Sequence, residues 1–370
     1  MSKVYAVIAG GGTAGHVVPG LAIGMALAEA GHAKSTIHFV GSRRGIDRRI
    51  IEPEGFPLTL LPGRGIARRL TLANIGAALG LIVAFLRSIG LLVRLRPRVV
   101  ISMGGYAAAP FGLVAGLARV PLVLAEQNAV PTATHRMLAR FATASAVPFE
   151  GTPLPGAVVT GNPVRSSILG IDQSPAGKKA AREALGLPSD RFVLVAFGGS
   201  LGSRRINDAV WALAAAWRNR SDIAIRHVVG ERDWDEVAGQ QLEQPPGGLV
   251  YQAVQYEDRM AELLNAADMA VCRSGGSVAE LAIARLPAVL VPLPIAPFDH
   301  QTHNASALVS IGGGILVPDP ELDGDRLALE VGRLVDDRGT LAAMADALEA
   351  VAAPDAAARV AALVEQVARG

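Results

Sequence analysis

The chain has 370 residues, of which 51% are hydrophobic and 18% charged, so it is long enough for about two folded domains and too apolar to be disordered. The formal net charge of +2 at pH 7 gives no case for general nucleic-acid binding. A single cysteine, Cys272, excludes an internal disulfide and fits a reducing, cytoplasmic compartment.

Short apolar runs alternate with helix-like segments along the chain, which predicts doubly wound α/β domains built on parallel sheets. The first half contains seven candidate strands, at 4–9, 36–40, 58–61, 99–102, 122–124, 145–147 and 158–160. The second half contains five, at 192–197, 223–229, 249–251, 269–272 and 288–291. After Pro318 the pattern predicts helices only, at 326–336, 341–352 and 356–368.

A change in composition near the middle of the chain marks a domain boundary. Gly161-Asn162-Pro163 is followed by a polar stretch at 172–179. We therefore expect an N-terminal domain over residues 1–163 and a C-terminal domain over 164–353. A last helix, at about 354–370, is expected to pack back on the N-terminal domain.

One apolar stretch, Leu70–Val93, is long enough to cross a bilayer. Asn74 and Arg87 interrupt it, and a charge near the middle disfavours a span, so we interpret the stretch as one or two helices of a folded domain. An apolar face flanked by arginines fits contact with an anionic membrane surface, and a buried helix with solvated arginines is the alternative. The flanking arginines are Arg64, Arg68, Arg69, Arg94, Arg96 and Arg98.

A first glycine-rich turn, Gly10 to Gly15, follows the first candidate strand. Such a turn presents free backbone N–H groups and the positive end of a helix dipole, which attract phosphate. The spacing also matches the dinucleotide fingerprint, and Arg43 and Arg44 after the second strand would suit the 2′-phosphate of NADP. A tight turn without a ligand is the third interpretation.

His16 lies beside this turn, at the start of a helix expected to begin near Val17 with Pro19 in its first turn. In an open α/β sheet this place faces the ligand-binding edge, where a neutral imidazole can take a proton from an alcohol. A histidine that only hydrogen-bonds the backbone of its helix fits equally well.

The second half contains a similar turn, Gly198 to Gly202, after the strand at 192–197. The two turns suggest two nucleotide-fold halves that face one cleft. A third helix start follows the strand at 269–272, with free N–H groups expected at Ser274 to Ser277. Glu280, one turn into that helix, can hold ribose hydroxyls or simply complement the helix dipole.

Polar residues from Asp299 to Asn304 are expected to cap and begin a further helix. Their carboxylate, imidazole and carboxamide groups suit hydrogen bonds to sugar hydroxyls. His300 and His303 also have the spacing of a metal pair, but no third ligand follows at a sensible distance in the sequence.

In this order and spacing, these segments resemble the MurG family of glycosyltransferases, and the resemblance covers nearly the whole chain. The family transfers N-acetylglucosamine from UDP-N-acetylglucosamine to a lipid-linked muramyl-pentapeptide. The segments are Gly11–Gly20, Met103–Tyr106, Glu126–Asn128, Gly161–Arg165, Gly198–Gly202, Cys272–Gly275 with Glu280, and the Gln301/Asn304 region.

The resemblance implies a GT-B architecture, two Rossmann-like domains with the sugar nucleotide held in the cleft, and no required cofactor or metal. It implies His16 as the catalytic base, and Thr13, His16 and Tyr106 as contacts of the acceptor. It also implies an undecaprenyl-linked acceptor and a peripheral protein on the cytoplasmic face of the inner membrane. The implied donor-binding residues are Thr13, Gly15, Asn128, Arg165, Gly199, Ser200, Ser274, Glu280, His300 and Gln301.

Two positions depart from the family pattern. Ala14 stands where the family commonly has glycine, so we expect a negative φ there. Ala125 stands where the family often has histidine, which leaves His16 as the expected base. An NADP-dependent oxidoreductase and a non-catalytic sugar-nucleotide-binding scaffold are the alternative functions.

Overall fold

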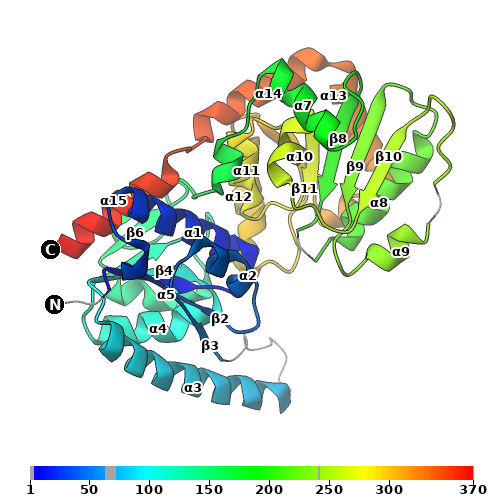
Figure 1. Ribbon diagram of the computed structural model, residues 1–370. Helices are drawn as coiled ribbons and strands as arrows, with labels where there is room; N and C mark the ends of the chain where they lie inside the picture. The colour runs from blue at the N-terminus through cyan, green and yellow to red at the C-terminus, as the bar shows by residue number, and fades with distance from the viewer. Residues whose placement is uncertain (1–3, 63–71, 200, 241, 370) are drawn as a thin grey trace. The chain divides into compact units, whose positions relative to one another are not determined.

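The computed structural model describes residues 4–62, 72–199, 201–240 and 242–369, without the side chains of 72–79. The chain divides into two compact units (Figure 1). Unit 1 comprises residues 1–165 and 353–370, and unit 2 comprises residues 166–352.

Unit 1 is built on a seven-stranded sheet with the order β3-β2-β1-β4-β5-β6-β7, in which all paired strands are parallel. This is the doubly wound order, with its switch point between β1 and β4. All seven strands expected in the first half are present. They are β1 (Ala6–Gly10), β2 (Ile37–Ser42), β3 (Leu58–Leu61), β4 (Val99–Gly104), β5 (Leu122–Ala125), β6 (Ala144–Val147) and β7 (Ala157–Val159).

Helices cover both faces of this sheet, which explains the continuous apolar runs of its strands. Ile8 of β1 packs in a core with α1 (Ala14–Glu29) and α15 (Ala356–Arg369). Val7, its neighbour, packs on the other face with α3 (Leu72–Leu95) and α4 (Gly105–Leu117). The C-terminal helix α15 therefore packs beside α1 although unit 2 separates them in sequence (Figure 1).

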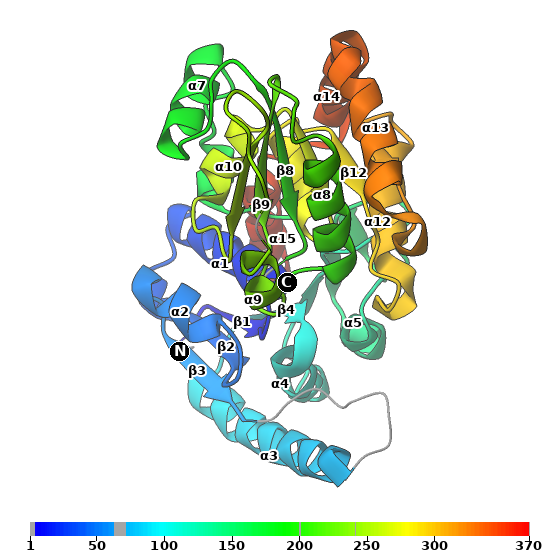
Figure 2. The same ribbon diagram turned by 90° about the vertical axis from the view of Figure 1, so that its right-hand side faces the viewer.

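Helix α3 is the single helix formed by the long apolar stretch, and it packs along α4 (Figure 2). Among the described residues, no helix combines the length and hydropathy needed to cross a membrane. The shorter helices of unit 1 lie in the segments between successive strands. They are α2 (Asp47–Ile51), α5 (Ala133–Leu138), η1 (Lys34–Thr36), η2 (Glu52–Glu54) and η3 (Ala139–Phe141).

Unit 2 contains a second parallel sheet, with the strand order β10-β9-β8-β11-β12-β13. Five of its strands are those expected from the sequence. The sixth, β13, was missed because it is only three residues long and directly follows two glycines. The strands are β8 (Phe192–Phe197), β9 (Ile223–Val228), β10 (Val250–Val254), β11 (Met269–Cys272), β12 (Ala288–Leu290) and β13 (Gly314–Leu316).

Helices again cover the sheet of unit 2. Leu194 and Val271 pack in one core with helices α8, α13 and α14, while α7 and α10 pack against each other elsewhere in the unit. The expected helix at 341–352 begins earlier, because Asp337 caps it by accepting from the N–H of Thr340 at 2.9 Å. The helices are α6 (Ser166–Leu169), α7 (Pro175–Ala184), α8 (Arg204–Ala216), α9 (Trp234–Ala238), α10 (Met260–Ala266), α11 (Ser277–Ile283), α12 (His300–Val309), α13 (Gly324–Asp336) and α14 (Arg338–Ala347), with η4 (Pro297–Asp299), η5 (Asp319–Glu321) and η6 (Leu348–Val351).

Candidate functional site

The first glycine-rich turn leads directly into α1, which begins at Ala14 rather than near Val17. Gly12, at φ +96°, redirects the chain, and the carbonyl of Thr13 accepts from the N–H groups of both His16 and Val17. His16 therefore lies inside the first helical turn. Ala14 is absent from the positive-φ residues of the described chain, so the expectation for its backbone is confirmed.

The His16 imidazole lies beside the Thr13 side chain and beside the backbone of two glycines. Its Nδ1 lies 3.2 Å from Thr13 Oγ1. A Cβ placed on Gly104 would lie 3.3 Å from His16 Nε2, and one on Gly105 would lie 3.3 Å from Nδ1. These two glycines, at φ +83° and +78°, let the end of β4 approach the ring, which stays only partly buried.

Tyr106 follows these glycines in the first turn of α4. Its hydroxyl donates to the carbonyl of Pro62 at 3.1 Å, and burial raises its pKa above the usual value. Thr13, His16 and Tyr106, the three residues expected to contact the acceptor, therefore lie where α1 and α4 begin, at the carboxyl ends of β1 and β4. Thr13 and Gly15 are exposed, as a ligand contact requires.

A buried hydrogen-bond network holds the loop after β5. One carboxylate oxygen of Glu126 accepts from the N–H of Gln127 and from the N–H and Nδ2 of Asn128, at 2.9–3.1 Å. The other accepts from the N–H of Thr132 and from His135 Nδ1, at 2.8 and 2.7 Å. Asn128, an expected donor contact, is thus oriented by Glu126.

Both ring nitrogens of His135 face acceptors. Nδ1 donates to Glu126, and Nε2 lies 3.0 Å from the carbonyl oxygen and 3.1 Å from the hydroxyl of Ser102. Burial raises the pKa of Glu126, but the hydrogen bond and charge of His135, with the hydrogen bonds from Thr132 and Asn128, lower it to about 2. Sequence reasoning missed His135, because α5 brings it to β4 and β5 only in the folded chain.

Sequence reasoning also missed Asp47, the first residue of α2. It is fully buried, and its carboxylate accepts from the N–H of Gly12 at 2.9 Å and from the N–H of Ser42 at 3.1 Å. One amide of the first glycine-rich turn is therefore already bound to a carboxylate of the chain itself. Arg43 and Arg44, which would suit NADP, are exposed.

Arg165 is the last residue of the first segment of unit 1 and is partly buried. The turn before it depends on Gly161 at φ +80°, where an added Cβ would lie 2.3 Å from the Cβ of Ala353. This close approach anchors the strand end that precedes Arg165 to the segment that leads into α15.

The second glycine-rich turn opens the thirteen-residue helix α8 in unit 2. Gly199 and Gly202 have φ of +88° and +80°, and the N–H of Gly202 donates to the carbonyl of Gly199 at 2.9 Å. A Cβ on Gly202 would lie 2.1 Å from the carbonyl oxygen of Val229, so only glycine fits there. Ser200 lies outside the described residues, as do Arg64, Arg68, Arg69 and Leu70.

Two buried side chains and the partly buried Tyr251 support this turn from α8, β9 and β10. Asn207 Nδ2 donates to the carbonyl of Val229 at 3.1 Å, and its Oδ1 accepts from His227 Nε2 at 3.0 Å. The hydroxyl of Tyr251 donates to His227 Nδ1 at 2.8 Å. Burial lowers the pKa of His227 to about 4, so the ring is neutral at pH 7.

The third expected helix start differs from the prediction. Helix α11 begins at Ser277, and Ser274 is fully buried in the loop before it. The Ser274 hydroxyl donates to the carbonyl of Gln301 at 2.8 Å, and its own carbonyl accepts from Asn304 Nδ2 at 3.1 Å. Ser274 thus joins this loop to α12. Glu280 lies in the first turn of α11 and is partly buried.

Helix α12 begins at His300, as expected from the sequence. Gln301 Oε1 accepts from the N–H of Leu293 at 2.9 Å, which fixes the loop after β12. His300 Nδ1 and His303 Nδ1 donate to the carbonyls of Pro297 and Asp299. Within the described residues, no cluster of three histidine, cysteine or acidic side chains has the geometry of a metal site.

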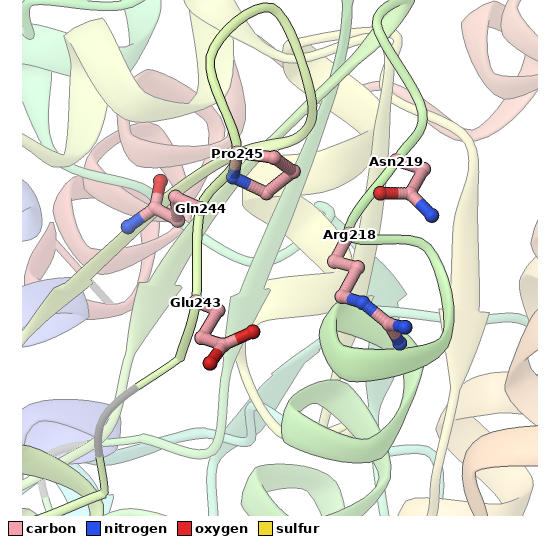
Figure 3. Close-up of a pocket in the computed structure, with 5 residues that line it drawn as sticks. All are labelled: Arg218, Asn219, Glu243, Gln244 and Pro245. Atoms are coloured by element: carbon pink, nitrogen blue, oxygen red, sulfur yellow. The ribbon is translucent and has the colours of Figure 1, made fainter.

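A surface cavity of about 420 Å³ lies elsewhere in unit 2 (Figure 3). It lies where α8 ends and before β10 begins, whereas ligands of open α/β sheets bind at the carboxyl ends of the strands. None of the expected site residues lines it. Its lining consists of Arg218, Asn219, Glu243, Gln244 and Pro245.

Comparisons with known proteins show the family of this chain. Residues 6–147 match the glycosyltransferase family 28 N-terminal domain, and residues 193–360 match the family 28 C-terminal domain. Two UDP-N-acetylglucosamine–N-acetylmuramyl-(pentapeptide) pyrophosphoryl-undecaprenol N-acetylglucosamine transferases match over nearly the whole chain. The protein from Desulforudis audaxviator is 37% identical over 373 residues, and that from Alkalilimnicola ehrlichii is 39% identical over 365, each with 98% of both chains covered.

Solved structures confirm the fold. The crystal structure of Acinetobacter baumannii MurG has a TM-score of 0.75 at 27% identity, covering 98% of this chain and 99% of that chain. The calicheamicin glycosyltransferase CalG4 has a TM-score of 0.66 at 16% identity, covering 99% and 98%, which shows the fold alone. None of these proteins is named as an oxidoreductase or a non-catalytic scaffold, so neither alternative gains support. With the two doubly wound domains of a GT-B glycosyltransferase and identity along its whole length, the chain belongs to the MurG family of family 28 N-acetylglucosamine transferases.

Proposed function

We propose that this enzyme transfers N-acetylglucosamine from UDP-N-acetylglucosamine to the 4-hydroxyl of the lipid-linked muramyl-pentapeptide, in peptidoglycan synthesis, with His16 as its base. The reaction follows from the whole-length identity to transferases of this name. The observation that carries the mechanism is the His16 imidazole. It is partly exposed at the carboxyl edge of a parallel sheet and has one nitrogen bound by a neighbouring hydroxyl.

The base acts through Nε2. Nδ1 lies 3.2 Å from Thr13 Oγ1, and the proposal assigns the proton of the neutral ring to Nδ1 and its lone pair to Nε2. Nε2 takes the proton of the acceptor hydroxyl while the hydroxyl oxygen bonds to the anomeric carbon of the donor. The bond from that carbon to the diphosphate oxygen breaks, UDP leaves from the opposite face, and the configuration inverts to β. Positioned bases of this kind contribute about 10²–10⁴-fold to rate.

Unit 2 is proposed to bind the donor. The N-terminus of α8, with Gly199 and Ser200 in its turn, receives the diphosphate, because free N–H groups and the helix dipole offset the charge that grows as UDP leaves. Glu280 binds the ribose hydroxyls, the backbone at Ser274 contributes a further N–H, and His300 and Gln301 contact the sugar. The same proposal assigns Thr13, Gly15, Asn128 and Arg165 to the donor, and Thr13, His16 and Tyr106 to the acceptor. It requires no cofactor or metal.

The exposed face of α3 is proposed to lie on the anionic, cytoplasmic surface of the inner membrane, where the lipid-linked acceptor resides. Ile82, Leu86 and Val93 are 56%, 60% and 63% exposed and lie on one helical face with the exposed Ile89. Arg87 and Arg94 are exposed on the same helix. Apolar side chains beside arginines favour the headgroup zone of anionic lipid, without a spanning helix.

The test of this function is direct transfer of labelled sugar. Incubation with labelled UDP-N-acetylglucosamine and a short-chain lipid-linked muramyl-pentapeptide is expected to give a labelled disaccharide product with a β-linkage and one UDP released per transfer. Release of UDP without labelled product, or transfer with retained configuration, would contradict the proposal. A thermal-shift comparison adds a second readout, since UDP-N-acetylglucosamine is expected to raise the melting temperature and NADPH is not.

A further inference from the structure

The carboxylate of Asp47 is buried, and the proposed mechanism gives it no role. Its side chain is 0% exposed, and its two oxygens accept from the N–H of Gly12 at 2.9 Å and from the N–H of Ser42 at 3.1 Å. Among the described residues, no cation forms an ion pair with it. Burial of a carboxylate costs free energy unless hydrogen bonds replace those to water, so the two amides stabilise the buried Asp47 side chain.

Three glycines surround this carboxylate. An added Cβ on Gly11 would lie 1.9 Å from Asp47 Oδ1, one on Gly41 would lie 2.4 Å from Oδ1, and one on Gly45 would lie 2.2 Å from Oδ2. Real Cβ atoms do not approach so closely, so each of the three positions must be glycine for the carboxylate to fit. Within the first glycine-rich turn, Gly11 is therefore required because it makes room for the Asp47 carboxylate.

We infer that Asp47 is a positioning residue whose carboxylate occupies the place of a bound anion at the first glycine-rich turn and thereby fixes the partner of the base. The inference rests on the proposed role of His16. Gly12 directly precedes Thr13, whose carbonyl accepts from the N–H of His16 and whose hydroxyl binds His16 Nδ1. Clamping Gly12 to the end of β2 therefore holds the Thr13 hydroxyl within hydrogen-bond distance of His16 Nδ1.

The isosteric variant Asp47→Asn tests this clamp. In either orientation its Nδ2 faces a backbone N–H, so one of the two hydrogen bonds is lost. We expect kcat to fall about 10–100-fold, less than on removing the base itself, with KM for UDP-N-acetylglucosamine unchanged. The matched control is Glu52→Gln, in the adjoining segment, where an exposed carboxylate pairs with Arg48 at 3.3 Å; its kcat is expected to stay at the wild-type value.

A smaller side chain at position 47 allows an anion added to the solution to restore kcat. Asp47→Ala leaves a space the size of a carboxylate, and formate is expected to restore kcat saturably, whereas chloride at equal ionic strength is not. His16→Ala should show no rescue. A wild-type kcat in Asp47→Asn, or a folded Asp47→Ala variant that formate does not rescue, would overturn the inference.

Hydrogen exchange gives a readout that does not depend on activity. In Asp47→Asn, the amides of Gly12 and Ser42 are expected to exchange faster, while those of the β4–β5 core keep their protection. Unchanged exchange at both amides would disprove the clamp. If wild-type protein failed to transfer sugar, the proposed function would fall, yet the exchange result would still decide whether Asp47 holds the turn.

Discussion

Two histidines of unit 1 have opposite surroundings, and this difference assigns their roles. His16 is partly exposed, and its Nδ1 lies 3.2 Å from Thr13 Oγ1. His135 is fully buried, and both of its nitrogens face acceptors on Glu126 and Ser102. His16, which is partly exposed, is therefore the proposed base, whereas the buried His135 joins the ends of β4 and β5.

Removal of the His16 imidazole is therefore expected to slow sugar transfer and to leave donor binding unchanged. His16→Ala is expected to lower kcat by about 10²–10⁴-fold, because the acceptor hydroxyl loses its base. The dissociation constant for UDP-N-acetylglucosamine, measured by calorimetry, is expected to stay unchanged. His303→Ala, at an exposed histidine of α12, serves as control and should keep kcat. A His16→Ala enzyme with near wild-type turnover would refute the assignment.

The Glu126–His135 pair predicts a pH dependence of stability. Glu126 has a folded-state pKa of about 2, below the ordinary value of 4.5, so its contribution is complete above pH 4.5 and is lost as pH falls toward 2. Glu126→Gln is expected to cost about 3–5 kcal/mol at pH 7, because it leaves His135 without its carboxylate. Urea unfolding between pH 2 and pH 7 should show a flatter profile for the variant. Parallel profiles would contradict the prediction.

At the scale of elements, each glycine-rich turn is supported by polar groups from neighbouring strands and helices. In unit 1 the support is Asp47 at the start of α2. In unit 2 it is the chain of Asn207, His227 and Tyr251, which links α8, β9 and β10. A neutral His227 is required, since it accepts from Tyr251 and donates to Asn207.

Tyr251→Phe tests this support. It removes the donor to His227 Nδ1 and leaves that nitrogen buried without a partner, so we expect a loss of about 1–3 kcal/mol in unfolding free energy at pH 7. The folded-state pKa of His227, about 4, lies below the ordinary 6.5, so its neutral-state contribution is complete above pH 6.5 and is lost as pH falls to 4. The difference between variant and wild type should shrink over that range. A constant difference in urea unfolding would count against this role.

If the exposed face of α3 contacts the membrane, the affinity for vesicles should depend on its apolar side chains. Leu86→Ser should weaken binding to phosphatidylglycerol vesicles about 10-fold, because it removes one apolar side chain from the proposed contact. Leu329→Ser, at a similarly exposed leucine of α13 in unit 2, is the control and should bind as wild type does. Vesicle co-sedimentation at several salt concentrations measures both. Equal weakening by the two substitutions would contradict a specific α3 contact.

The sequence predicted whole elements better than their ends and their partners. Of the thirteen strands in the described residues, twelve were predicted from short apolar runs, because strands that are buried on both faces have apolar residues at consecutive positions. The starts of α1 and α11 were misplaced because they depend on one glycine φ and on loop hydrogen bonds. Asp47 and His135 were missed because their partners, Gly12 and Ser102, lie 35 and 33 residues away, and no local pattern encodes such pairings.

At the scale of the whole molecule, unit 1 is completed by α15, which follows unit 2 in the sequence. Val360 and Val364 are buried in the same core as Val17 and Ile8. Deletion of residues 356–370 is expected to lower the unfolding temperature of unit 1 selectively and to leave the transition of unit 2 in place. Calorimetry of the truncated chain should resolve the two transitions. A uniform shift of both would contradict this division.

This arrangement sets an order of events on the ribosome. The strands of the first sheet emerge early, but the flank of α1 stays uncovered until α15 leaves the exit tunnel. Every residue of the second sheet is available before that moment. Unit 1, which carries the proposed base, therefore reaches its final packing only after unit 2 has been synthesised, so a chain terminated between residues 352 and 356 would contain all of unit 2 and an incomplete unit 1.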